Sequence, residues 1–256
     1  MDIPTTALLI GAGLLGGIMA SIVGGAAVVT YPALIAAGVA PQTSVVSNLI
    51  AIMPATMVAA LSDRSQLPPF NRAFVGLIVA SVVGAGVGAI MLLLTPQRLF
   101  TAFVPLLLGF ATLLFAYSER IGKWLRQRAS GRGHEIKFNV GSLKMLLPVS
   151  FYGGYFGAGV GVLILAVFSV ATGGEYRSAN VTKNFVTSLN GMAATCVFIL
   201  HGAVAWPQTF ALIAGTIGGG FAGSYIARVI PRNIVRVLIV VVGALRTVSV
   251  ARRYWF

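Results

Sequence analysis

Acidic residues are scarce in this sequence, and none of them lies within an apolar run. The 256 residues include five Asp and Glu against 18 Lys and Arg, and charged residues make up 9% of the chain. A soluble domain has about a quarter of its residues charged. The acidic residues all lie at the edges of apolar runs or between them: Asp2, Asp63, Glu119, Glu135 and Glu175. A proton- or sodium-driven pump usually keeps a carboxylate within the membrane, so the sequence does not point to one.

Cysteine and recognisable catalytic motifs are also nearly absent. Cys196 is the single cysteine, which excludes an internal disulfide and a zinc-binding cysteine pattern. No Walker motif is present, no His, Cys, Asp and Glu cluster has metal-ligand spacing, and no Ser-His-acid arrangement is suggested. We therefore expect no cofactor, no metal site, no direct use of ATP and no enzymatic activity.

The formal net charge of +13 would suggest nucleic acid in a soluble protein. Here the basic residues lie between apolar runs, a pattern typical of topology signals and lipid headgroup contacts. We therefore expect a lipid bilayer and no nucleic acid as partner.

Long uncharged stretches are what the sequence has instead. Mean hydropathy is +0.93, and no charged residue occurs in residues 3–62, 73–97, 99–118, 145–174 or 184–227. About 20 apolar residues cross the hydrocarbon core. The runs do not alternate with a period of two, as the strands of a membrane barrel do, and helices satisfy their own backbone polar groups in lipid. The sequence predicts an all-α integral membrane protein with several crossings.

We expect about eight transmembrane segments in two four-segment repeats. The apolar segments lie at residues 6–36, 43–62, 70–94, 97–117, 142–172, 179–200, 206–228 and 233–251. The stretch Glu119–Lys137 is the one long polar interval and carries a basic excess, so we expect it on the cytoplasmic side. The predicted organisation is an N-terminal repeat over 1–118, a basic loop over 119–140 and a C-terminal repeat over 141–256.

The two halves resemble each other when the first is shifted by 136 positions, because Asn48 then meets Asn184 and several glycines coincide. The first segment of each half is too long for one crossing, since thirty helical residues span about 45 Å against a core of about 30 Å. A tilted helix, a broken helix and a re-entrant pair remain open. Single crossings would give parallel repeats, with both termini on the side of the basic loop. Re-entrant pairs would give inverted repeats. A homodimer is also left open.

The richest polar cluster opens the sixth segment. Asn180, Lys183, Asn184 and Thr187 follow at spacings of three and four, so they share one face of a helix. Their ammonium, amide and hydroxyl groups, together with a helix N-terminus, suit a small anion. Arg177 lies nearer the loop and could pair with Glu175. In the first half, Asn48 is retained and Ser47 stands in place of Lys183.

Paired glycines in the first segment of each half are the second candidate feature, because glycine permits a chain break and leaves backbone amides free for a ligand. The predicted substrate-binding set is therefore formed by residues of both kinds: Ser47, Asn48, Arg177, Asn180, Lys183, Asn184, Thr187, Gly24, Gly25, Gly159 and Gly161.

The runs Gly153–Gly161, Arg177–Asn184 and Trp206-Pro207 resemble the sulfite exporter TauE/SafE family of membrane permeases, and Gly24-Gly25 to Pro32 with Asn48 is similar to its N-terminal repeat. The resemblance implies export of sulfite, sulfonate, sulfoacetate or related small anions across the bacterial inner membrane. An inside-negative potential drives anions outward by about 2.3 kcal/mol per charge per 100 mV, so an exporter of anions can work without a buried carboxylate. An anion channel and a non-transporting scaffold subunit remain the alternatives.

Overall fold

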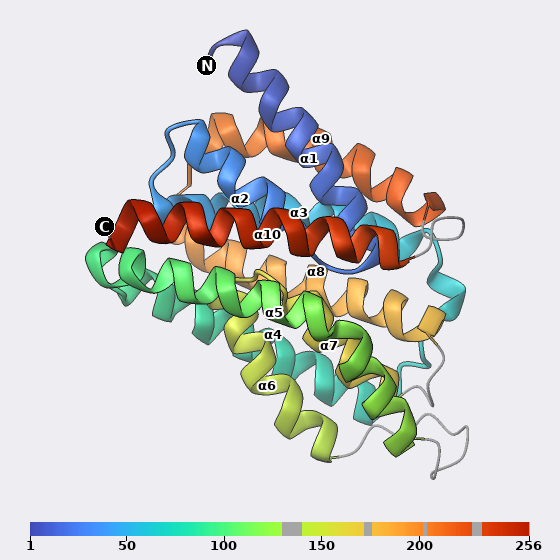
Figure 1. Cartoon of the computed structure of the whole chain (residues 1–256). Coiled ribbons are helices and arrows are strands. Elements are labelled where there is room, and N and C mark those ends of the chain that lie inside the picture. The colour runs from blue at the N-terminus through green and yellow to red at the C-terminus, as the bar shows by residue number, and fades with distance from the viewer. Residues whose placement is uncertain (130–139, 172–175, 202–203, 227–231, 256) are drawn as a thin grey trace.

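The computed structural model describes residues 1–129, 140–171, 176–201, 204–226 and 232–255. All regular structure in these residues is helical (Figure 1). The elements, in chain order, are α1 (Ile3–Ile22), α2 (Ala27–Ala36), α3 (Pro41–Leu61), the short 3-10 turn η1 (Arg64–Gln66), α4 (Arg72–Leu94), α5 (Gln97–Ala129), α6 (Val140–Tyr155), α7 (Val160–Ala171), α8 (Tyr176–Leu200), α9 (Trp206–Ile226) and α10 (Arg232–Trp255).

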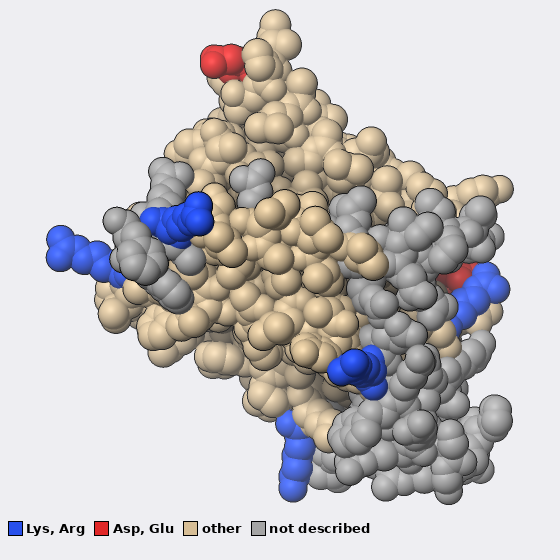
Figure 2. Space-filling model, viewed as in Figure 1, with Lys and Arg blue, Asp and Glu red and all other residues tan. Residues whose placement is uncertain are grey.

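The outer surface is that of a membrane protein. Five stretches of helix in the described part of the chain are long and apolar enough to cross a bilayer: Ile3–Ile22, Pro41–Leu61, Arg72–Leu94, Gln97–Ser118 and Trp206–Ile226. Large apolar side chains such as Val79 on α4 and Leu106 on α5 are more than half exposed. In Figure 2 the visible charged residues lie at the top, at the left and right edges and on the lower part of the molecule, and the broad area between them is uncharged. The chain is therefore a multi-pass helical membrane protein, because such an area is stable against lipid and not against water.

The predicted segment 6–36 is a pair of helices folded back on each other. α1 ends at Ile22, Gly24 adopts a φ of +92°, and α2 begins at Ala27. The two arms run antiparallel, since Leu9 packs in one cluster with Leu34 and Gly16 lies against Thr30. α2 has 10 residues and is about 15 Å long, half the hydrocarbon thickness of about 30 Å.

The predicted segment 142–172 folds in the same way. α6 ends at Tyr155, Gly157 and Gly159 have φ of +77° and +78°, and α7 begins at Val160. Leu146 of α6 packs in one cluster with Phe168 of α7, so the arms are again antiparallel. The structure thus answers the question that the sequence left open, in favour of folded-back pairs, and the count of eight crossings is not confirmed.

The helices α1 to α5 pack reciprocally with the helices α6 to α10. α1 packs along α9 and α6 packs along α4, while α3 packs on α8 and α5 on α10. In Figure 1, α1 descends from the top towards the right, whereas α6 rises from the bottom towards the left. Counterpart helices therefore run in opposite directions, which is the arrangement of inverted repeats and not of parallel ones.

The boundary of the predicted basic loop changes. α5 continues to Ala129, so the first part of the range 119–140 is helix, and residues 130–139 lie outside the described part of the chain. The first and last described residues lie towards the left of Figure 1, while α5 ends and α6 begins at the lower right. The termini and the centre of the chain are thus at opposite ends of the molecule. A cytoplasmic position of the central loop stays a prediction.

Candidate functional site

The two helix breaks meet inside the molecule. A methyl group added to Gly24 would lie 2.6 Å from the Cα of Gly161, and one added to Gly161 would lie 2.7 Å from the Cα of Gly24. The chain can approach this closely because neither residue has a side chain. The tips of the two folded-back pairs, which come from different halves, are therefore in backbone contact.

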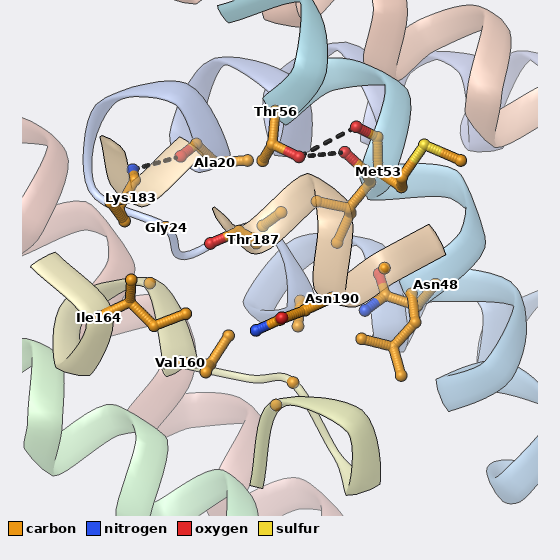
Figure 3. Close-up of a pocket in the computed structure, with 18 residues that line it drawn as sticks. Ala20, Gly24, Asn48, Met53, Thr56, Val160, Ile164, Lys183, Thr187 and Asn190 are labelled. Atoms are coloured by element: carbon orange, nitrogen blue, oxygen red, sulfur yellow. Dashed lines mark hydrogen bonds between the residues drawn. The ribbon is translucent and has the colours of Figure 1, made fainter. Parts of the chain in front are cut away.

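A cavity lies beside this contact (Figure 3). It offers about 50 Å³ to the centres of water-sized molecules, and one water needs roughly 10 to 15 Å³ on that scale. The cavity is therefore the size of a few waters or one small ion. Both helix breaks, α3 and α8 line it, with polar side chains from Asn48, Thr56, Lys183, Thr187 and Asn190.

Two short helices begin at the cavity. Ala26 and Ala27 at the start of α2 line it, as do Val160 and Gly161 at the start of α7. The first N–H groups of a helix lack partners within the helix, and the helix dipole is positive there. Two positive helix ends from opposite halves thus lie at one cavity, which favours negative charge there.

Lys183 brings a full positive charge to the same space. Among the described residues that line the cavity, it is the one with a charged side chain. It is 1% exposed, and its Nζ donates a hydrogen bond of 3.0 Å to the carbonyl of Ala20 (Figure 3). An ammonium group has three protons to donate, so the Ala20 bond leaves two for a ligand.

Asn48 and Thr187 add neutral polar groups. The Oδ1 of Asn48 accepts a short hydrogen bond from Thr30 Oγ1, and its amide nitrogen points towards the middle of the cavity in Figure 3. The Oγ1 of Thr187 is buried and has no hydrogen-bond partner in the described part of the chain. A buried polar atom without a partner is unusual and calls for an explanation; a ligand in the cavity would supply one.

The polar face of α8 also holds the end of α1. The hydroxyl of Tyr176 donates to the carbonyl of Ile22 at 2.8 Å, and the amides of Asn180 and Asn184 both donate to the carbonyl of Ser21 at 3.2 Å. Together with the bond from Lys183 to Ala20, these contacts fix the last turn of α1 beside the break. We call Tyr176, Asn180, Lys183 and Asn184 the α1 cap.

The structure separates the predicted binding residues into three groups. Those that line the cavity are Gly24, Asn48, Gly161, Lys183 and Thr187. Asn180 and Asn184 are in the α1 cap, and the cavity lining does not include them. The predicted shared face of Asn180, Lys183 and Asn184 does exist, because all three contact adjacent carbonyls of α1.

Four other predicted residues lie elsewhere. Ser47 accepts a hydrogen bond of 3.3 Å from the backbone amide of Ala205, just before α9. Gly25 packs against Ile239 and Phe115, and Gly159, which has a positive φ at the second break, packs against Ala111. Arg177 is 55% exposed and forms a two-pronged ion pair with Asp63, with both N···O distances 2.7 Å.

Sequence reasoning did not assign Asn190 to the site. Asn190 is buried on the cavity wall and forms a ring of hydrogen bonds with Ser81 and Ser150, at distances of 2.9, 3.3 and 2.6 Å. Its position seven residues after Lys183, on the same helix face, was the available signal. The two serines are isolated polar residues in apolar runs, and nothing in the sequence connects α4 with α6.

A bundle of crossing helices, with a small cavity that holds a few polar side chains at the meeting point of two broken elements, is typical of membrane transporters. The sequence profile of the family "Sulfite exporter TauE/SafE" matches residues 9–250, and the chain belongs to this family.

Curated relatives agree with that class. The chain is 21% identical over 257 residues to a "Probable membrane transporter protein" of Haemophilus influenzae strain Rd, covering 100% of this chain and 98% of the relative. It is 25% identical to "Probable membrane transporter protein ORF9" of a Sinorhizobium species (93% and 88% covered) and 25% identical to "Probable membrane transporter protein YfcA" of Escherichia coli K12 (90% and 84% covered). No solved structure matches the chain.

Proposed function

We propose that this transporter exports small sulfur oxyanions, with sulfite as the first candidate, across the bacterial cell membrane. The observation that carries the proposal is the cavity at the meeting point of the two helix breaks. It combines the ammonium of Lys183 with the positive ends of α2 and α7, and no acidic side chain is among its described lining residues.

The balance of charge supports an anion over a cation or a neutral solute. An unpaired positive charge buried in protein is costly. The carbonyl of Ala20 accepts one hydrogen bond from the ammonium of Lys183 but carries no negative charge to balance it. A bound anion completes the pairing of Lys183. The amide nitrogen of Asn48 and the hydroxyl of Thr187 are then available to orient its oxygens.

The size of the cavity supports the smaller of the family's substrates. A cavity of about 50 Å³, which is the space of a few waters, suits a small ion such as sulfite, with one sulfur atom and three oxygens. A sulfonate that carries an organic group, such as sulfoacetate, is larger than sulfite. We therefore rank sulfite before the sulfonates.

The test is anion flux into proteoliposomes under an imposed membrane potential. We expect saturable sulfite flux for the parent protein and at least about a tenfold loss for Lys183→Ala, since loss of one charged hydrogen bond costs about 1.5 to 3 kcal/mol and each 1.4 kcal/mol is a factor of ten. Lys144→Gln is the matched control, because it removes the same charge from an exposed position on α6.

The outcomes separate the alternatives. Flux that shows counterflow and saturation supports a carrier, whereas unitary currents in a planar bilayer identify an anion channel. No flux of any tested anion, with a partner that co-purifies, identifies a scaffold subunit. Undiminished flux in folded Lys183→Ala contradicts the proposed site, and recovery of the protein outside the inner-membrane fraction contradicts the proposed location.

A further inference from the structure

At the C-terminal end of α1, three carbonyl groups receive no hydrogen bond from a backbone N–H group. The N–H groups of Val23 and Gly24 both donate to the carbonyl of Met19, each at 2.9 Å. The carbonyls of Ala20, Ser21 and Ile22 therefore have no donor from the following turn. A helix C-terminus also carries a partial negative charge, so this end of α1 attracts a cation.

Side chains of the α1 cap donate hydrogen bonds to these carbonyls. Two amide oxygens of the cap have no donor among the described residues. Asn180 and Asn184 both turn their amide nitrogens to Ser21. Their Oδ1 atoms are buried and have no partner among the described residues. Asn184 is 2% exposed. Neutral donors therefore reach the carbonyls of Ser21 and Ile22, and the carbonyl of Ala20 meets the charged group of Lys183.

We propose that the ammonium of Lys183 occupies a binding site for a monovalent cation at the end of α1. Backbone carbonyls at the C-terminal end of a broken helix are ligands that alkali ions take inside membrane proteins. The Nζ lies 3.0 Å from the carbonyl of Ala20. The protein thus carries its cation as a side chain and needs no free sodium or potassium ion at this position.

The inference goes beyond anion transport and is tested without any anion substrate. Purified Lys183→Ala removes the ammonium and most of the side-chain volume. We expect its melting temperature to be lower than that of the parent. It should rise saturably with sodium, potassium or methylammonium chloride against N-methylglucamine chloride at constant ionic strength. The expected rise is about 5 to 10 °C at a cation concentration 100 times the dissociation constant.

Lys183→Met is the matched control, because it fills the same space without a charge or a donor. We expect its melting temperature to be insensitive to the choice of cation. Lys183→Arg keeps a charge and should also be insensitive. The parent protein should show no cation-specific shift, because its own ammonium fills the site.

Three results would overturn the proposal. One is a saturable sodium or potassium effect on the parent, which would place the free-cation site elsewhere. Another is a melting temperature of Lys183→Ala that does not distinguish the small cations from N-methylglucamine. The third is a Lys183→Ala protein that cannot be purified folded in any of the four salts, since a free cation should then replace the ammonium. Each result leaves the sulfite flux of the parent unaffected, so it can be told apart from failure of the proposed function.

Discussion

The end of α1 and the end of α6 share one backbone device and differ in their side chains. In α6 the N–H groups of Phe156 and Gly157 both donate to the carbonyl of Tyr152, at 2.9 and 3.2 Å, as Val23 and Gly24 do to Met19. Each break then turns through a glycine with positive φ.

At the end of α1, the four residues of the α1 cap donate hydrogen bonds to the carbonyls that lack a backbone donor. At α6, Leu49 of α3 lies against Gly157, and no side chain in the described part of the chain donates to the carbonyls of residues 153–155. The two halves thus share the folded-back backbone, and the charged side chain beside the breaks comes from one half. A single charged centre facing two positive helix ends is suited to one small anion at a time.

The largest effect should come from adding a methyl group where the two breaks touch. We expect Gly24→Ala to lower the free energy of unfolding by about 2 to 5 kcal/mol, because it combines a positive φ with a backbone clash. Gly161→Ala has the clash alone, and Gly38→Ala has the positive φ of +81° with open space around it. Denaturation of the three variants in detergent separates the two causes, with Gly11→Ala as the open-space control. Equal losses for Gly24→Ala and Gly11→Ala would contradict the contact.

A middle-sized effect should distinguish the capped end of α1 from the uncapped end of α6. Asn180 and Asn184 donate to the same carbonyl of Ser21, so one can serve when the other is lost. We expect each single change to alanine to cost about 1 kcal/mol. The double change should cost more than the sum, because it leaves a buried carbonyl without a donor. A double-mutant cycle measured by thermal unfolding checks this, and simple additivity would show that the two amides act separately.

The smallest effect should come from the pair of Asp63 and Arg177, which lies outside both breaks. Arg177 is 55% exposed, and exposed ion pairs contribute about 0 to 1 kcal/mol and weaken with salt. We expect Asp63→Asn to change stability by less than about 1 kcal/mol, with the difference shrinking at high ionic strength, and to leave sulfite flux at the level of the parent. A large loss of flux would mean that this end of α8 takes part in transport.

Prediction from the sequence succeeded where one physical cause acts locally. Uncharged runs too long for a soluble core indicated a helical membrane protein, and the family profile confirms the predicted family. The spacing of Asn180, Lys183 and Asn184 predicted one shared helix face, which the contacts with α1 show. The substrate-binding role of these residues stays a prediction.

Prediction was incomplete where partners come from distant parts of the chain. Nothing local in Lys183 indicates that its acceptor is Ala20, and nothing in Ser81 indicates Ser150 and Asn190. The shift of 136 positions between the halves stays a prediction, and the C-terminal ends of α1 and α6, at Ile22 and Tyr155, lie 133 positions apart. The shift could not decide between parallel and inverted repeats, because that depends on whether residues 6–36 cross the membrane or fold back.

By itself, the sequence determined that this chain enters lipid as helices, because residues 3–62 and the other uncharged runs have no stable alternative in water or in the bilayer. It also determined where those helices can break, since Gly24 and Gly157 adopt a positive φ that other residues avoid. The tertiary structure alone decided that the breaks meet and that Lys183 lies beside them. Such contacts depend on how the helices pack together, and packing is a property of the whole fold and not of any one segment.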